Sequence, residues 1–183
     1  MVKFKNYFSL LILSIITVIV SNCNTDKPES YFGKAVLNVN LMHGFANETL
    51  SLQLKSPSVK LTDDGGTATM KRKEVIDGKL ISVEENYEKV KSLKETAETK
   101  NMLDASKSLH EYVIPVYKNE YTKLAGMYDN GASPEDIQTF TNSINEKYYN
   151  GYLEKFDKLI AAGKIYAEKN NIKVNWDVKT STD

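Results

Sequence analysis

Two histidines and one cysteine are the side chains of this 183-residue chain best suited to hold a metal or a haem. A di-metal site in a helical bundle needs a glutamate three residues before each of two histidines. Those positions hold Asn40 before His43 and Lys107 before His110. A c-type haem needs a pair of cysteines, and Cys23 is the only one. We therefore predict no cofactor and no metal, and keep a metal or haem carrier that uses His43 or His110 as the alternative.

The serines show no pattern typical of a catalytic nucleophile. The chain has no Gly-x-Ser-x-Gly turn and no Ser-x-x-Lys with its companion motifs. Ser108 precedes His110 by two residues, a spacing that turns the two side chains to different faces of a helix. We predict that the protein is not an enzyme, and the rival hypothesis is a periplasmic or surface enzyme that uses His43 or His110.

The first 23 residues have the layout of a bacterial secretion signal. Two lysines precede an apolar run of 14 residues, 7–20. A helix that crosses a membrane needs about 20 apolar residues, so this run favours a signal peptide over a membrane span. The residues that follow, Ser21-Asn22-Cys23, resemble the lipobox of bacterial lipoproteins, although Asn22 departs from the usual small residue. The alternative is an uncleaved membrane anchor.

This resemblance implies that residues 1–22 are removed and that Cys23 becomes a lipid-bearing N-terminus. A lone thiol would be left reactive in an oxidising compartment, and lipid attachment removes that problem. A diacylglyceryl group and an N-acyl chain together are sufficient for stable membrane attachment. Asn24 after the cysteine resembles the sorting class of the outer membrane. We predict a lipidated tether over 23–33 and a location at the outer membrane of a bacterial envelope, facing either the periplasm or the outside.

The charge of the mature chain argues against nucleic acid as a partner. After removal of 1–22, 22 basic and 24 acidic side chains remain, a formal charge of −2. The densest basic cluster is Lys71-Arg72-Lys73, and Glu74 and Asp77 follow it closely. Nucleic-acid binding needs a basic stripe that contacts successive phosphates. We therefore expect this cluster to be a solvated helix face.

Periodic apolar residues predict an all-α fold. Apolar residues recur every three or four positions from about residue 67 to 90, over 99–128 and over 134–170. The segment 34–54 also fits a helical stripe, although 50–54 alternates as a half-buried strand would. We favour a helix there, followed by a loop through 57–66. The prediction is an antiparallel four-helix bundle over 34–174 in one domain, with a polar tail over 175–183.

Several residues are typical of the ends of the last two predicted helices, and one should interrupt a helix. Gly131 suits a left-handed cap at the end of one helix. Ser133 suits the N-cap of the next, and Pro134 suits its first turn. Pro115 removes one backbone donor, so we expect a kink near 111–114. The tail 172–176 alternates, and we expect it to be extended with Trp176 covering a helix end.

The tyrosines are either core residues or the lining of a ligand cleft. Most of them complete the helical stripes, which favours the core. Tyr149 does not follow the stripe of Tyr148 and Tyr152, so it is the best single candidate for an exposed contact.

Two segments resemble a known family. They are 112–128, which begins Tyr112-Val113-Ile114-Pro115, and 156–174, which begins Phe156-Asp157-Lys158. Both are similar to small, mostly helical surface lipoproteins of leptospires and Bacteroidetes-type bacteria, over about 70–174. The resemblance implies a lipoprotein with a helical bundle and brings no catalytic residue. We predict a lipid-anchored binding module for an envelope protein or a small apolar molecule, and a purely structural lipoprotein is a further alternative.

Overall fold

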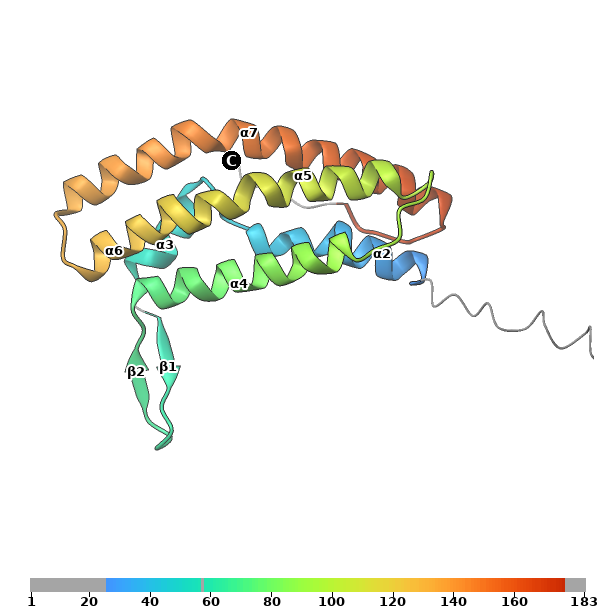
Figure 1. Ribbon diagram of the computed structural model, residues 1–183. Helices are drawn as coiled ribbons and strands as arrows, with labels where there is room; N and C mark the ends of the chain where they lie inside the picture. Colours follow the sequence, from blue (N-terminus) through green and yellow to red (C-terminus); the bar gives the residue numbers. More distant parts are fainter. Residues whose placement is uncertain (1–25, 57, 177–183) are drawn as a thin grey trace, which may run out of the picture.

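The computed structural model of the chain describes residues 26–56 and 58–176 (Figure 1). These residues are mostly helical, with one two-stranded sheet, so the all-α prediction is confirmed. The predicted cleavage site and Cys23 lie outside the described residues, as do positions 177–183. Within the described part of the chain, no helix is long and apolar enough to cross a membrane.

Long helical segments run up and down beside one another (Figure 1). Helix α4 (Arg72–Lys91) leads into α5 (Lys100–Val116), which continues through the π-helix η3 (Tyr117–Tyr121) into α6 (Thr122–Asp129). Helix α7 (Pro134–Lys169) then returns along α5, and α4 packs against both α5 and α6. The apolar stripes predicted from the sequence form the core between these elements.

The junction between α6 and α7 is the one that the sequence predicts. Gly131 has a φ of +71°, and Pro134 stands in the first turn of α7. The Ser133 hydroxyl accepts a hydrogen bond from the backbone N–H of Asp136 at 3.1 Å, which completes the N-cap. Pro115 lies inside α5, and the irregular turn follows it at η3 instead of preceding it near 111–114.

The N-terminal part differs from its prediction in two ways. The tether does not extend to residue 33, because helix α2 (Pro28–Ala35) begins at Pro28 and buries Tyr31 and Phe32 in the core. The single helix over 34–54 is also wrong. The chain forms α2, the 3₁₀-helix η2 (Leu37–Met42), a loop over 43–47 and helix α3 (Glu48–Lys55). Of the two alternatives for 50–54, the helix is confirmed.

The segment predicted as a loop contains a β-hairpin. Strand β1 (Val59–Leu61) pairs antiparallel with β2 (Thr67–Thr69), and the pair stands out from the helices (Figure 1). Asp64 closes the turn by accepting hydrogen bonds from the Thr62 hydroxyl and from the backbone N–H of Gly66. Helix α4 therefore starts at Arg72, later than the predicted start near residue 67.

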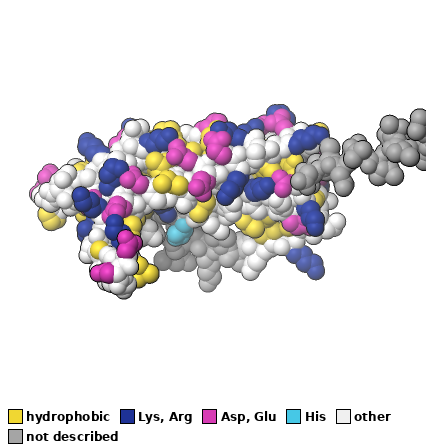
Figure 2. All heavy atoms as spheres, turned by 60° about the horizontal axis from the view of Figure 1, so that its bottom comes forward, with side chains coloured by type: hydrophobic (Ala, Val, Ile, Leu, Met, Phe, Trp, Pro, Cys, Tyr) yellow, Lys and Arg dark blue, Asp and Glu magenta, His cyan; other side chains and the backbone are white. Residues whose placement is uncertain are grey.

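The basic cluster 71–73 marks the start of α4. The Asp129 carboxylate accepts hydrogen bonds from the backbone N–H groups of Arg72 and Lys73, at 2.8 and 3.0 Å. Arg72 Nε donates to the Leu54 carbonyl oxygen at 3.2 Å, and Lys73 pairs with Asp77. Basic and acidic side chains are interspersed over the face shown in Figure 2, without a broad area of one sign.

The C-terminal tail begins later than predicted. Residues 172–176 have no regular secondary structure, and the Trp176 ring meets the Phe32 ring edge to face, with 5.8 Å between centroids. Lys164 Nζ of α7 lies 5.5 Å from the centre of the same indole. Trp176 thus covers a buried residue of α2, and the folded body extends to residue 176 instead of ending at 174.

Candidate ligand pocket

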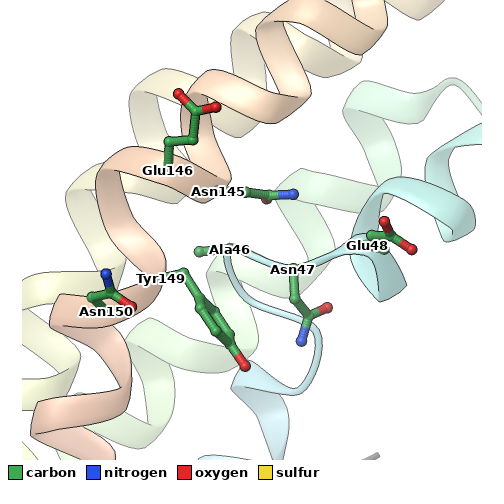
Figure 3. A pocket seen from close by; sticks show the side chains of 7 residues that line it. All are labelled: Ala46, Asn47, Glu48, Asn145, Glu146, Tyr149 and Asn150. Carbon is green, nitrogen blue, oxygen red and sulfur yellow. The ribbon is translucent and has the colours of Figure 1, made fainter. Parts of the chain in front are cut away.

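An open pocket of about 350 Å³ lies between the start of α3 and the middle of α7 (Figure 3). Its volume is at the lower end of the range of small-molecule sites. Two segments supply its walls, one from the loop before α3 and one from α7. The lining residues are Ala46, Asn47, Glu48, Asn145, Glu146, Tyr149 and Asn150.

The loop over 43–47 is held in place by a cluster of aromatic rings. Phe45 is fully buried, and its ring lies between 5.0 and 6.4 Å, centroid to centroid, from the rings of four tyrosines. These tyrosines come from α5, η3 and α7, and they are Tyr112, Tyr117, Tyr121 and Tyr152. The apolar faces of these elements thus enclose the Phe45 side chain of the loop over 43–47.

The backbone of this loop has an unusual conformation. Ala46 has a φ of +51° although it is not glycine, and only 1% of its surface is exposed. Its N–H donates a hydrogen bond to the Tyr121 hydroxyl at 2.8 Å. Gly44 has a φ of +82°, and a Cβ there would lie 3.0 Å from the Leu50 backbone nitrogen. A non-glycine residue in the left-handed region costs free energy and is often found at functional sites.

The π-helix η3 carries two of the four tyrosines that surround Phe45. Tyr117 and Tyr121 are buried, with 5.2 Å between their ring centroids. Burial raises the pKa of both phenols. Only Tyr121 has a partner, since the Tyr117 hydroxyl makes no hydrogen bond within the described residues.

The two tyrosines should therefore respond in opposite ways to removal of the hydroxyl. Tyr121→Phe is expected to lower the free energy of unfolding by about 1–3 kcal/mol, because the Ala46 N–H would stay buried without an acceptor. Tyr117→Phe removes an unpaired hydroxyl and should leave stability unchanged or raise it by up to about 1 kcal/mol. Urea denaturation of the two variants in parallel measures both. Equal losses would contradict the assigned roles.

The polar side chains of the pocket differ in how they are engaged. Asn47 Oδ1 accepts a hydrogen bond from the backbone N–H of Thr49 at 2.8 Å, which caps α3 and leaves its NH₂ group for other partners. Asn145, Tyr149 and Asn150 form no side-chain hydrogen bond within the described part of the chain. Figure 3 shows Asn145 reaching from α7 toward the loop, and Tyr149 extending on the same side as Asn47. The pocket therefore presents unused donors and acceptors beside one aromatic ring.

Most of the described tyrosines lie in the core or pack against it, and Tyr149 also lines this pocket. Tyr117, Tyr121, Tyr152 and Tyr166 are buried, as the stripe pattern predicts. Tyr149 is half-buried and lines the pocket, so the residue selected for its position outside the stripe does lie at the candidate site.

The two histidines lie in different environments. His110 is fully buried, and its ring stacks on Tyr87 with 5.5 Å between centroids. Its Nδ1 lies 2.8 Å from the Ser106 carbonyl oxygen, and its Nε2 lies 3.0 Å from Asn86 Nδ2. The carbonyl can only accept and the amide NH₂ can only donate, so the ring carries its proton on Nδ1 and is neutral.

His43 is exposed, directly after η2. The described residues contain no group of three histidine, cysteine or acidic side chains arranged to hold a metal. Both ring nitrogens of His110 are thus hydrogen-bonded within the core. The described residues therefore offer no arrangement that supports a metal or haem carrier, or an enzyme, that uses His43 or His110.

Sequence reasoning did not find the loop side of the pocket. Nothing in the sequence distinguishes Ala46, Asn47 or Asn145 as residues of a pocket. Gly44 was the one available indication, because a glycine inside an apparent helical stripe often marks a break.

The fold and the pocket define a small helical protein with a ligand-sized depression between α3 and α7. No family model, curated protein or solved structure matches the chain. The resemblance to surface lipoproteins therefore stays a prediction.

Proposed function

We propose that this protein is a lipoprotein of a bacterial outer membrane, anchored through Cys23, whose helical domain binds a small ligand in the pocket beside Tyr149. In this proposal the domain is an antiparallel four-helix bundle, in which α2, η2 and α3 together take the place of the first helix. Its mechanism is recognition by a tethered domain.

The pocket carries the proposal. Its loop is held by buried contacts at Phe45 and Ala46, whereas three polar side chains of the lining, Asn145, Tyr149 and Asn150, form no hydrogen bond among the described residues. A preformed site loses little conformational freedom when a ligand binds. This combination of a fixed backbone and unpaired polar groups is expected for a binding site. Most of the exposed pocket surface is apolar, and polar side chains stand around it, so the pocket suits a ligand with both apolar and polar parts.

The anchor rests on the sequence of the first 23 residues. Only four residues separate Cys23 from the first residue of α2. An extended chain spans at most about 3.6 Å per residue, which keeps the start of α2 within roughly 20 Å of a lipid attached to Cys23. A lipidated protein would therefore hold its helical domain close to the membrane surface.

Native mass spectrometry of the full-length gene product, extracted from bacterial membranes, tests this function. The expected species begins at Cys23, carries acyl chains and retains a small ligand. The ligand should be lost from Tyr149→Ala and kept by Asn142→Ala, an exposed position on α7 that does not line the pocket. A chain that retains residues 1–22 would contradict the anchor. Absence of any ligand, or a ligand kept by Tyr149→Ala, would contradict the pocket.

A further inference from the structure

The lining of the pocket has a distinctive balance of polar groups. It contains three amide side chains, two carboxylates and one phenol, and no lysine, arginine or histidine. An amide both donates and accepts hydrogen bonds, as a hydroxyl group does. A site of this kind suits a ligand that is rich in hydroxyl groups.

The charges in the pocket disfavour an anion. Glu48 and Glu146 are both acidic, and no basic side chain lines the cavity to pair with a phosphate or a carboxylate. Like charges in a partly enclosed site repel. Glu48 stands in the first turn of α3, where the positive end of the helix dipole offsets part of its charge. Glu146 extends away from Asn47 and Tyr149 in Figure 3, so amide and phenol groups border the space between those two residues.

One aromatic ring stands beside these polar groups. Tyr149 extends from α7 along the same side of the pocket as Asn47 (Figure 3). A tyrosine offers a flat apolar face together with a hydroxyl. Pyranose rings have a face of C–H groups and a rim of hydroxyls, so they can use both parts of this lining.

We propose that the pocket binds a neutral saccharide. In this arrangement the Tyr149 ring packs against one face of the sugar, and the Asn145 amide and the Asn47 NH₂ group hydrogen-bond to its hydroxyls. The proposal rests on the binding function proposed above and names the chemical class of its ligand. The contacts at Phe45 and Ala46 fix the conformation of the loop before the sugar binds.

Amide-resolved NMR titration of the full-length mature protein tests the ligand class. The protein is kept in a detergent without a sugar headgroup. The neutral probes are cellobiose, maltose and N,N′-diacetylchitobiose, the cationic probe is spermidine, and the anionic probe is glucose 6-phosphate. A neutral disaccharide is expected to shift the signals of 46–48 and 145–150. Its affinity should fall at least tenfold in Tyr149→Ala and in Asn145→Ala.

Two further variants separate a local effect from misfolding. Asn142→Ala lies one turn away on α7 and should bind as the wild type does. Tyr149→Phe keeps the ring and should retain more affinity than Tyr149→Ala. Binding of spermidine or glucose 6-phosphate at these residues, with no disaccharide binding, would overturn the neutral saccharide as the ligand and leave the binding function intact. A pocket that responds to none of the probes, in a protein that co-purifies with no ligand, would overturn both.

Discussion

Phe45→Ala is expected to lower the free energy of unfolding by about 3–5 kcal/mol, the usual cost of removing a fully buried phenylalanine. The Phe45 ring contacts four tyrosines from three other elements, so its loss would open a cavity where α5, η3 and α7 meet. The loop that carries Ala46 and Asn47 would also lose its main attachment. Chemical denaturation measures the stability, and the NMR signals of 46–48 report the order of the loop.

Phe140→Ala provides the matched control for this prediction. Phe140 lies on α7, is half-buried and has Lys123 Nζ 4.5 Å from its ring centre. Its removal leaves no closed cavity and should cost clearly less than Phe45→Ala. Similar losses in both variants would show that Phe45 does not hold the loop.

The elements that sequence reasoning placed well are those specified by neighbouring residues. The start of α7 depends on Ser133 and Pro134, and the end of α6 depends on Gly131, all within a few positions. The long amphipathic stripes are of the same kind, because each residue of a stripe is defined by its own helix. These features need no knowledge of the rest of the fold.

The elements that it missed depend on contacts between distant positions. The left-handed backbone at Ala46 is held by Tyr121, which is 75 positions away. The start of α4 is capped by Asp129, which is 57 positions from Arg72. The helical stripe over 34–54 gives no sign of Tyr121, and the stripe that begins near residue 67 gives no sign of Asp129. Tertiary contacts overrode local propensity at both places.

The pocket was only half predictable for the same reason. Tyr149 could be selected because it falls outside the stripe of its own helix. Ala46 and Asn47 reach the pocket only because the loop turns back toward α7, a path that Phe45 and Tyr121 determine. A single sequence identifies the tyrosine and leaves its opposite wall unassigned.

Asn86→Ala is expected to lower the free energy of unfolding by about 2–4 kcal/mol. The Asn86 side chain connects α4 to three other elements, because it donates to His110 Nε2 and to the Lys34 carbonyl oxygen and accepts from Asn38 Nδ2. A buried polar group left without its partner costs about 1–3 kcal/mol, and this substitution leaves more than one such group without a partner. Urea denaturation at pH 7.5 measures the loss. A change below about 1 kcal/mol would show that the network is not needed.

The same network predicts how stability depends on pH. Burial lowers the pKa of His110 below its ordinary value near 6.5, and the amide of Asn86 faces Nε2 with a donor that conflicts with a second ring proton. As the pH falls through 6.5, the unfolded chain takes up a proton before the folded one does, so the stability due to the neutral ring is present above this pH and is lost below it.

His110→Gln isolates this contribution. The glutamine can accept from Asn86 through its carbonyl oxygen, and it does not titrate. Between pH 7.5 and 5 the wild type is expected to lose more stability than His110→Gln, because carboxylates affect both proteins equally in this range. Denaturation curves at several pH values give the difference between the two slopes. Identical slopes would mean that His110 takes up its proton as easily in the folded protein as in the unfolded chain, which burial of the ring and the Asn86 donor at Nε2 oppose.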